Sequence, residues 1–127
     1  IGGSLPLWAT AIGRAWLAGV APAQREAALR QVRAEHPAAW RAHRATVLAE
    51  LQAFARRGFC VGLGDWQQDV YAVAVPLQLS IDGETLVFNC GVPAVLLDAG
   101  TLERETGPRL VRMVRAVEQA WRAGHAT

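Results

Sequence analysis

Hydrophobic periodicity changes twice along this 127-residue chain, and these changes constrain its fold more than any other feature. Up to Gly58, apolar residues recur at spacings of three and four, which is typical of amphipathic helices. Residues 59–92 instead contain short runs rich in valine and aromatic residues, separated by turn residues, which is typical of strands. Beyond residue 101 the helical spacing returns. This order predicts an α+β fold in which helices pack on an antiparallel sheet.

Three helices are predicted before the strands. The first has Thr10 as its N-cap, runs to about Leu17 and stops at Gly19. The second follows Pro22 and is closed by Pro37, and its apolar residues lie on one side. Those residues are Ala28, Leu29 and Val32.

The third helix and the closing helix have clear apolar sides. The third spans 46–58, with Thr46 as its N-cap and Gly58 just past its last turn. Its apolar side is predicted to comprise Val47, Leu48, Leu51, Phe54 and Ala55. The closing helix spans 101–122, and Gly107-Pro108 predicts a break or kink because proline has no backbone N–H. Its buried side is predicted to comprise Leu102, Leu110, Val114, Val117 and Trp121.

The predicted strands are "FCVGLG" (59–64), "VYAVAVPLQL" (70–79) and "TLVFNCGV" (85–92). An Asp82-Gly83 pair separates the last two, which is a strong signal for a hairpin turn. We therefore expect the last two strands to pair directly.

Composition excludes several classes of protein. With 52% hydrophobic and 19% charged residues, the chain resembles an ordinary globular domain with one core. Its apolar stretches are interrupted well before the ~20 residues that a bilayer requires, so no membrane partner is expected. The formal charge is only +2, and the arginines alternate with glutamates, whereas a nucleic-acid surface requires clustered positive charge. We expect no direct DNA binding by this chain.

No catalytic or metal-binding set is predicted. Cys60 and Cys90 have neither the spacing of a metal site nor that of a disulfide framework, which fits a reducing cytoplasm. Asp65 and Asp69 flank the polar "DWQQD" and are expected to face solvent in a loop. The histidines lie at helix ends or in connections, where nothing links them to a cysteine. We therefore expect neither an enzyme nor a cofactor.

Five segments resemble one known family. "LPLWATAIGRAWLAG" is similar to the LPLHATAxGKALLA segment in the effector-binding domain of IclR-type bacterial transcriptional regulators. "ELQAFARRGFCV", "VYAVAVPL", "LVFNCGVPA" and "GPRLVRMVRAVEQAW" follow in the family's order. The resemblance implies that residues 1–127 form the later two-thirds of such a domain. The family's winged helix-turn-helix, linker helix and leading strands have no counterpart in this sequence.

The resemblance also implies a GAF-like fold with a ligand cavity on one side of the sheet. A small carboxylic acid would be the effector, and its binding would change how a homodimer or homotetramer holds its DNA-binding domains. DNA would be a partner only through the winged helix-turn-helix of the parent protein. Two other functions remain open: a ligand-free oligomerisation module and a small enzyme.

The family's pocket positions can be transferred to this sequence. Its two backbone donors at the helix start fall on Ala11 and Ile12, beside Thr10, and its histidine falls on Trp8. Independently of the family, such a helix start is a ready site for an anion. The family's aspartate, cysteine and two serines fall on Gly62, Ala72, Phe88 and Cys90, respectively. The implied effector site comprises Trp8, Thr10, Ala11, Ile12, Gly62, Ala72, Phe88 and Cys90.

Because most polar side chains are lost from these positions, an acid with an aromatic or otherwise apolar body is expected. Trp8 and Phe88, together with Trp66 and Tyr71, are candidates for the aromatic walls. Burial preference alone favours a core role for Phe88 and Ala72, and only the resemblance assigns them to the site. Three further tryptophans are assigned to packing or to an oligomer face: Trp16, Trp40 and Trp121.

Overall fold

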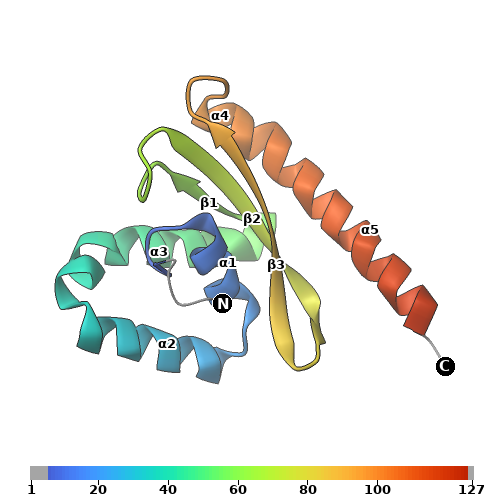
Figure 1. The fold of residues 1–127 in the computed structure, drawn as a ribbon, viewed down its shortest axis with the longest axis horizontal. Coiled ribbons are helices and arrows are strands. Elements are labelled where there is room, and N and C mark those ends of the chain that lie inside the picture. Colours follow the sequence, from blue (N-terminus) through green and yellow to red (C-terminus); the bar gives the residue numbers. More distant parts are fainter. Residues whose placement is uncertain (1–5, 126–127) are drawn as a thin grey trace.

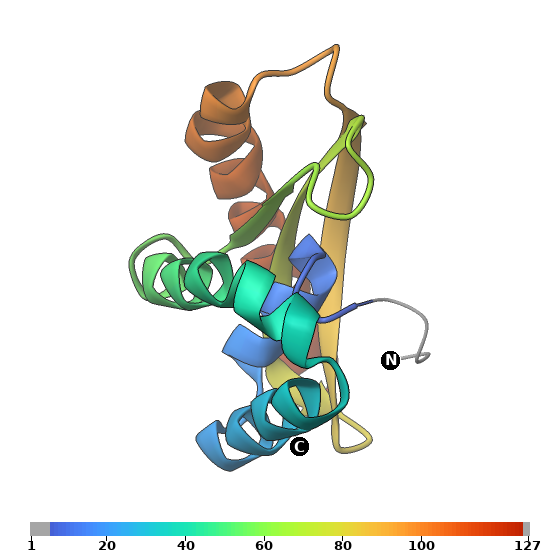
Figure 2. The same ribbon diagram turned by 90° about the vertical axis from the view of Figure 1, so that its left-hand side faces the viewer.

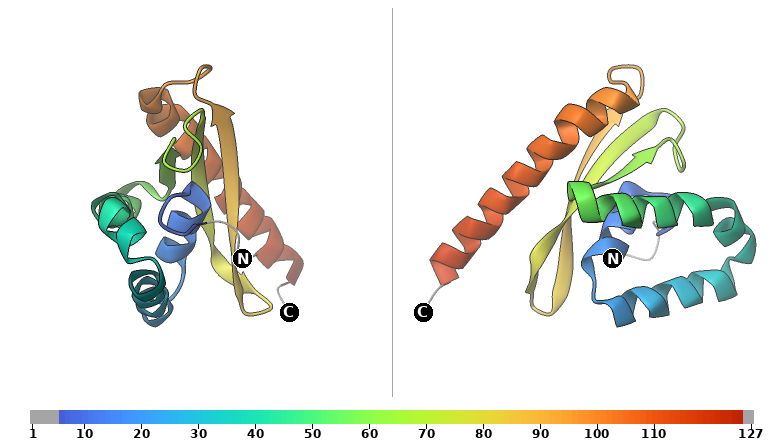
Figure 3. Two further views of the ribbon diagram at one scale, coloured as in Figure 1. Left: turned by 60° about the vertical axis from the view of Figure 1, so that its left-hand side comes forward. Right: turned by 180° about the vertical axis from the view of Figure 1, so that it is seen from behind.

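Three antiparallel strands form the centre of the computed structural model, which describes residues 6–125. They are β1 (Cys60–Leu63), β2 (Val70–Ile81) and β3 (Glu84–Pro93), in the spatial order β1-β2-β3. Helices α1, α2 and α3 lie on one side of the sheet and α5 lies on the other (Figures 1 and 3). The predicted α+β class and the antiparallel sheet are therefore confirmed.

The hairpin between β2 and β3 turns at the predicted pair. Asp82 and Gly83 have φ angles of 53° and 77°, and two consecutive residues with positive φ are what a tight hairpin turn requires. The neighbouring strands are antiparallel, with Val73 opposite Cys90 and Val75 opposite Phe88.

The first three helices begin and end at recognisable signals. Helix α1 (Ala11–Gly19) has Thr10 as its N-cap, as predicted, and α2 (Pro22–Glu35) ends just before Pro37. Helix α3 (Pro37–Arg57) is longer than the predicted 46–58, so Thr46 is not its N-cap. Pro37 occupies its first turn, where the missing N–H has no partner to lose.

The sides of α3 also differ from the prediction. Val47 is fully buried, but Leu48 is 39% exposed and Ala55 is also exposed. Helix α3 packs against α1, α2 and β1, and Leu48 and Ala55 lie outside these contacts. The cluster between these helices comprises Leu17, Leu29, Val32, Trp40 and Val47.

The closing segment changes helix type rather than breaking. A short α4 (Ala99–Thr101) leads into a π-helical turn, η1 (Leu102–Thr106), and then into α5 (Gly107–His125). The Gly107 N–H donates to the carbonyl of Leu102, five residues earlier. A wider turn at this point accommodates Pro108, which has no N–H to donate.

Helix α5 buries Leu110, Val114 and Glu118, whereas the predicted Val117 and Trp121 are each 39% exposed. The Glu118 carboxylate accepts hydrogen bonds from the backbone N–H of Gln78 and, at 2.7 Å, from Arg115. A buried carboxylate is retained because these donors compensate for its desolvation. Sequence patterning counts a glutamate as a surface residue, which is why the predicted buried side was displaced.

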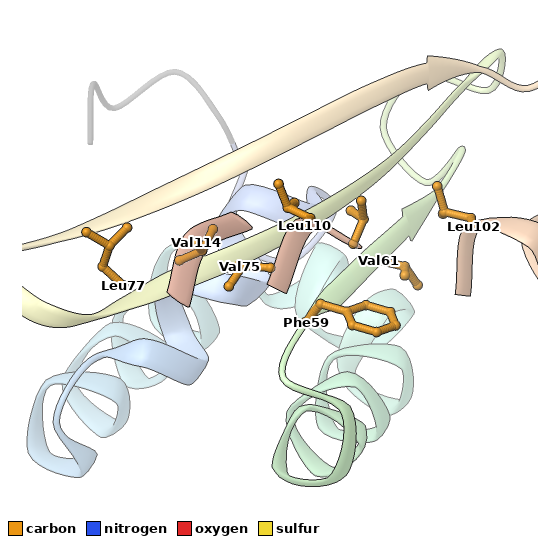
Figure 4. Packing of buried hydrophobic residues seen from close by; sticks show 8 residues of the cluster. Phe59, Val61, Val75, Leu77, Leu102, Leu110 and Val114 are labelled. Atoms are coloured by element: carbon orange, nitrogen blue, oxygen red, sulfur yellow. The ribbon is translucent and has the colours of Figure 1, made fainter. Parts of the chain in front are cut away.

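The main core lies between α5 and the sheet (Figure 4). The Phe59 ring is 2% exposed and packs against Gly107, where a Cβ atom would overlap the ring. The remaining buried members are Val61, Val73, Val75, Leu77, Leu102, Leu110 and Val114. Within residues 6–125, no helix combines the length and apolar character needed to span a membrane.

Candidate ligand-binding site

A cavity of about 210 Å³ lies on the α1 side of the sheet, opposite the face that α5 covers. Its lining comes from residues 9–12 around the start of α1, from residues 64–67 of the loop between β1 and β2, and from β1, β2 and β3. In Figure 2 the start of α1 and this loop lie in front of the strands. Residues 9–12, 62–72 and 89–91, which are distant in sequence, thus enclose one volume.

A row of three very small residues lies on the sheet side of the cavity, which Val70 and Asn89 complete. Gly62 of β1 lies opposite Ala72 of β2, and Ala72 lies opposite Gly91 of β3. No side chain in this row extends beyond a methyl group, so the row leaves space above the sheet. The volume exceeds the ~150 Å³ of an apolar cavity that takes up benzene. A single aromatic ring therefore fits.

The helix start presents two free backbone donors. Thr10 Oγ1 accepts from the N–H of Gly13 at 3.0 Å, and the Thr10 carbonyl accepts from Arg14 at 3.0 Å. The N–H groups of Ala11 and Ile12 precede these bonds, and within residues 6–125 no hydrogen bond uses them. Both residues line the cavity. The positive end of the α1 dipole therefore adds to two donors beside the cavity.

Gly62 keeps one of these donors accessible. A Cβ atom at this position would lie 3.2 Å from the amide nitrogen of Ala11, closer than an ordinary van der Waals contact. A Cβ at Gly91, in the same row, would have its nearest neighbour, a methyl of Val70, at 3.9 Å. The two glycines therefore differ: one borders an amide donor, and the other borders open space.

A buried arginine ties together the segments that surround the cavity. Arg14 is 1% exposed, and its Nε and Nη2 donate to the Trp8 carbonyl at 3.1 and 2.9 Å. Its Nη1 donates to the Val61 carbonyl at 3.0 Å and lies 2.9 Å from Asp65 Oδ2. The side chain of Asp65 is about one-third exposed and lines the cavity. The Arg14–Asp65 ion pair thus holds the 64–67 loop beside the helix start.

Sequence reasoning missed this ion pair. It expected Asp65 to face solvent in a loop, and the residue is exposed there, but it gave Asp65 no partner and Arg14 no role. The available signal was the position of Arg14 on the buried side of α1, four residues after Thr10, where an unpaired charge would be costly. The partner lies 51 residues along the chain, so no local pattern could identify it.

The structure brings five of the eight implied site residues to the cavity. They are Thr10, Ala11, Ile12, Gly62 and Ala72. Trp66, which is 51% exposed, is the aromatic residue of the lining. Asn89 and Gly91, which the sequence analysis did not select, also line it.

Trp8, Phe88 and Cys90 lie elsewhere, so the expected aromatic chamber is not formed by these residues. Trp8 packs with the cluster of α1, α2 and α3, and its ring centroid lies 4.8 Å from that of His36. Phe88 and Cys90 pack against the core beneath α5, as does Tyr71. Successive residues of a strand face opposite sides of a sheet, so Asn89 and Gly91 face the cavity instead.

Cys60 is a buried free cysteine at the edge of this region. Burial, with a smaller contribution from the charge of Glu50, raises the pKa of the Cys60 thiol to about 12. The thiol is thus protonated at neutral pH and is a poor nucleophile. Among residues 6–125, no cluster of three or more potential ligand side chains could hold a metal ion.

Comparison with known proteins identifies the family. The family model described as "Bacterial transcriptional regulator IclR C-terminal" matches residues 1–119. The chain belongs to this IclR C-terminal family. The family resemblance inferred from the sequence segments is therefore confirmed, and the domain is one found in transcriptional regulators.

Solved structures share this IclR C-terminal fold. An IclR family transcriptional regulator from Brucella abortus is 38% identical, with a TM-score of 0.87 over 94% of this chain and 45% of its own. An IclR regulator from Alicyclobacillus acidocaldarius is 21% identical, with a TM-score of 0.64 over 92% of this chain and 46% of its own.

A third similar structure is the inducer-binding domain of the Acinetobacter transcription factor PobR, a double mutant in complex with 3-hydroxybenzoic acid. It is 22% identical, with a TM-score of 0.61 over 90% of this chain and 67% of its own. The chain thus spans less than half the length of the first two regulators. No curated protein sequence matches it closely enough to count as a relative.

Proposed function

We propose that this domain binds a small carboxylic acid with an aromatic or otherwise apolar body, and that binding modulates the DNA binding of the regulator to which the domain belongs. The observation that carries the proposal is the pair of N–H groups of Ala11 and Ile12, which no hydrogen bond within residues 6–125 uses and which border a cavity with a row of small apolar residues on its sheet side. The coarser function, that of a transcriptional-regulator domain, follows from the family.

The helix start suits the charged end of such a ligand. Two N–H groups that have no partner among residues 6–125 lose no hydrogen bond to this part of the chain when a carboxylate arrives, and the helix dipole favours the negative charge. Each hydrogen bond to a charged group contributes about 1.5–3 kcal/mol. The two amides can therefore orient a carboxylate without any charged side chain.

The floor suits the apolar end. The row of Gly62, Ala72 and Gly91 leaves a shallow surface without large side chains, and Trp66 supplies a ring in the adjacent loop. Micromolar affinity corresponds to a binding free energy of roughly −8 kcal/mol. A ligand of about ten heavy atoms reaches this value if each atom contributes about half of the maximum of about −1.5 kcal/mol per heavy atom. The inducer-binding domain of PobR, which has the same fold, is in complex with a single-ring acid of this size class.

Gly62 and Gly91, the two glycines of the row on the sheet, offer a matched test in which calorimetry measures the affinity for benzoic acid. Gly62→Ala places a methyl group against the Ala11 amide, and we expect the affinity to fall about tenfold or more, because one charged hydrogen bond is weakened. Gly91→Ala adds the same methyl to the same row without approaching an amide, and we expect a change of less than about threefold. Circular dichroism checks that both variants are folded.

The neutral analogue benzyl alcohol completes this test, because it should bind the wild-type domain at least about tenfold more weakly than benzoic acid does. Equal losses in the two glycine variants would contradict a carboxylate at the Ala11 amide. The absence of binding by every acid of a broad panel would favour the alternative function, a ligand-free oligomerisation module. That alternative has one supporting observation: Met113, Val117 and Trp121 are exposed at four-residue spacing along α5.

A further inference from the structure

We propose that Asp65, positioned by Arg14, is a hydrogen-bond acceptor subsite of the cavity, and that the ligand carries an O–H or N–H donor in addition to its carboxylate. This inference rests on the proposed function and deepens it. It concerns the end of the ligand that lies away from the α1 amides.

An acidic side chain in an anion-binding cavity requires an explanation. Asp65 lines the same cavity as the amides of Ala11 and Ile12, and two like charges in one site repel each other. Arg14 lies against Asp65 at 2.9 Å and offsets its charge. The net charge of the pair is therefore close to zero. Asp65 can still accept hydrogen bonds from a ligand.

Arg14 itself is not the partner of the ligand carboxylate. Its guanidinium is 1% exposed, does not line the cavity, and is engaged with the Trp8 and Val61 carbonyls as well as with Asp65. Arg14 is thus a positioning residue, which holds the Asp65 carboxylate and the loop that carries it. The ligand carboxylate is left with the α1 amides.

Asp65 has capacity for another donor. Its Oδ2 faces Arg14, and within residues 6–125 no hydrogen bond uses Oδ1. An ionised carboxylate can accept about four hydrogen bonds and can donate none. Among the other polar side chains of the lining, the Thr10 hydroxyl already donates to the Pro6 carbonyl and accepts from the Gly13 N–H. Gln67 and Asn89 both donate and accept, so they do not distinguish a donor from an acceptor. Asp65 therefore selects for a ligand that carries a hydrogen-bond donor, because its ionised carboxylate can accept hydrogen bonds but cannot donate them.

The selectivity should be large because a site built around a polar group rejects an analogue that leaves this group unpaired. A methyl group against Asp65 would desolvate the carboxylate without a hydrogen bond, and a methoxy oxygen would face it as a second acceptor. A hydroxyl or amino group at the same position satisfies it. The ligand class is thus a carboxylic acid with a second, hydrogen-bond-donating substituent.

The test uses benzoic acids that carry a hydroxy, methyl or methoxy group at ring position 3 or 4. Calorimetry with the wild-type domain should show a preference of about tenfold or more for hydroxy over methyl and methoxy at one of the two positions. In Asp65→Ala this preference should fall to within about twofold, while the methyl acids bind at least as tightly as before.

Two further variants separate the subsite from other effects. Asp69→Ala removes a carboxylate from the same loop but not from the cavity lining, so the hydroxy preference should remain. Asp65→Asn keeps an oxygen for Arg14 and presents an amide donor to the ligand, so the preference for hydroxy over methoxy should be lost even if Asp65→Ala fails to fold.

The outcomes distinguish the subsite from the proposed function. If the acids bind the wild-type domain without any hydroxy preference, or if the preference persists in both Asp65 variants, the subsite is overturned and the carboxylate site stands. If no acid binds the wild-type domain, both are overturned. An equal loss of preference in Asp69→Ala would assign the effect to loop charge and would overturn the subsite.

Discussion

The two faces of the sheet are built from alternate residues of the same strands, yet they differ in what they enclose. Beneath α5, Val73, Val75 and Phe88 belong to a close-packed core. Beneath the start of α1, Gly62, Ala72 and Gly91 leave a cavity. Side-chain size, and not the backbone, therefore separates the close-packed face from the face that encloses the cavity. Substitutions on one face should therefore leave the property of the other face unchanged.

The largest effect is expected at the α5 face. Phe59→Ala removes a ring that is 2% exposed and packed on Gly107, so the free energy of unfolding should fall by about 3–5 kcal/mol. Urea denaturation followed by circular dichroism measures this loss. Phe59→Leu, which retains more volume, should cost about 1.5 kcal/mol or less and leave benzoic acid affinity within about twofold. A weakened affinity for benzoic acid in a folded Phe59→Leu variant would contradict the expectation that the two faces act independently.

Adjacent residues of β2 give a sharper test. Val73→Phe overpacks a fully buried position and should reduce the free energy of unfolding by about 1–3 kcal/mol. Ala72→Val adds volume on the cavity side and should change it by less than about 1 kcal/mol, because the added methyl groups enter free space. The binding effects should be reversed, with benzoic acid affinity falling about tenfold or more only in Ala72→Val. Equal stability losses would mean that the cavity closes in solution.

An effect that is absent at neutral pH concerns the buried end of the α1 face, where Cys60 packs with Ala11, Ala15 and Ala74. Its pKa is raised from 9.0 to about 12, so above pH 9 the unfolded chain loses a proton that the folded chain keeps. The unfolded state then binds fewer protons, and stability must decrease as pH rises from about 9 towards 12.

The expected slope of this decrease approaches about 1.4 kcal/mol per pH unit, relative to a Cys60→Ala variant, in which the group is absent. Urea denaturation of both proteins at a series of pH values from 8 to 11 gives the difference directly. Parallel curves for the two proteins would show that the thiol is solvated, and hence that the α1 face is open beyond the cavity.

The order of helices and strands was predictable because its signals are local. Thr10 caps α1 through the Gly13 amide, Gly58 ends α3 at a φ of 83°, and Asp82-Gly83 forms the hairpin turn. Each of these depends on a few neighbouring residues. The start of α3 was missed because Pro37 both follows α2 and begins α3, and a single residue cannot show which role dominates.

The cavity was predictable only in part. Five lining residues were expected from the family segments and from the physics of a helix start. They are Thr10, Ala11, Ile12, Gly62 and Ala72. Phe88 and Cys90 did not reach the cavity because a shift of one residue along β3 exchanges the two faces, and the packing of α5 decides which face is covered. The exposure of Val117 and Trp121 likewise depends on how much of α5 the sheet covers.

By itself, the sequence determined the fold class, the N-cap of α1, the end of α3, the hairpin turn and the start of a helix that offers amide donors, since these are properties of short segments. Only the tertiary structure decided which alternate residues of β3 face the cavity, that Glu118 is buried on α5, and that Arg14 pairs with Asp65. The physical reason is that burial and ion pairing depend on the distance between segments in space. No periodicity along the chain indicates that Arg14 of α1 contacts Asp65 in the loop after β1.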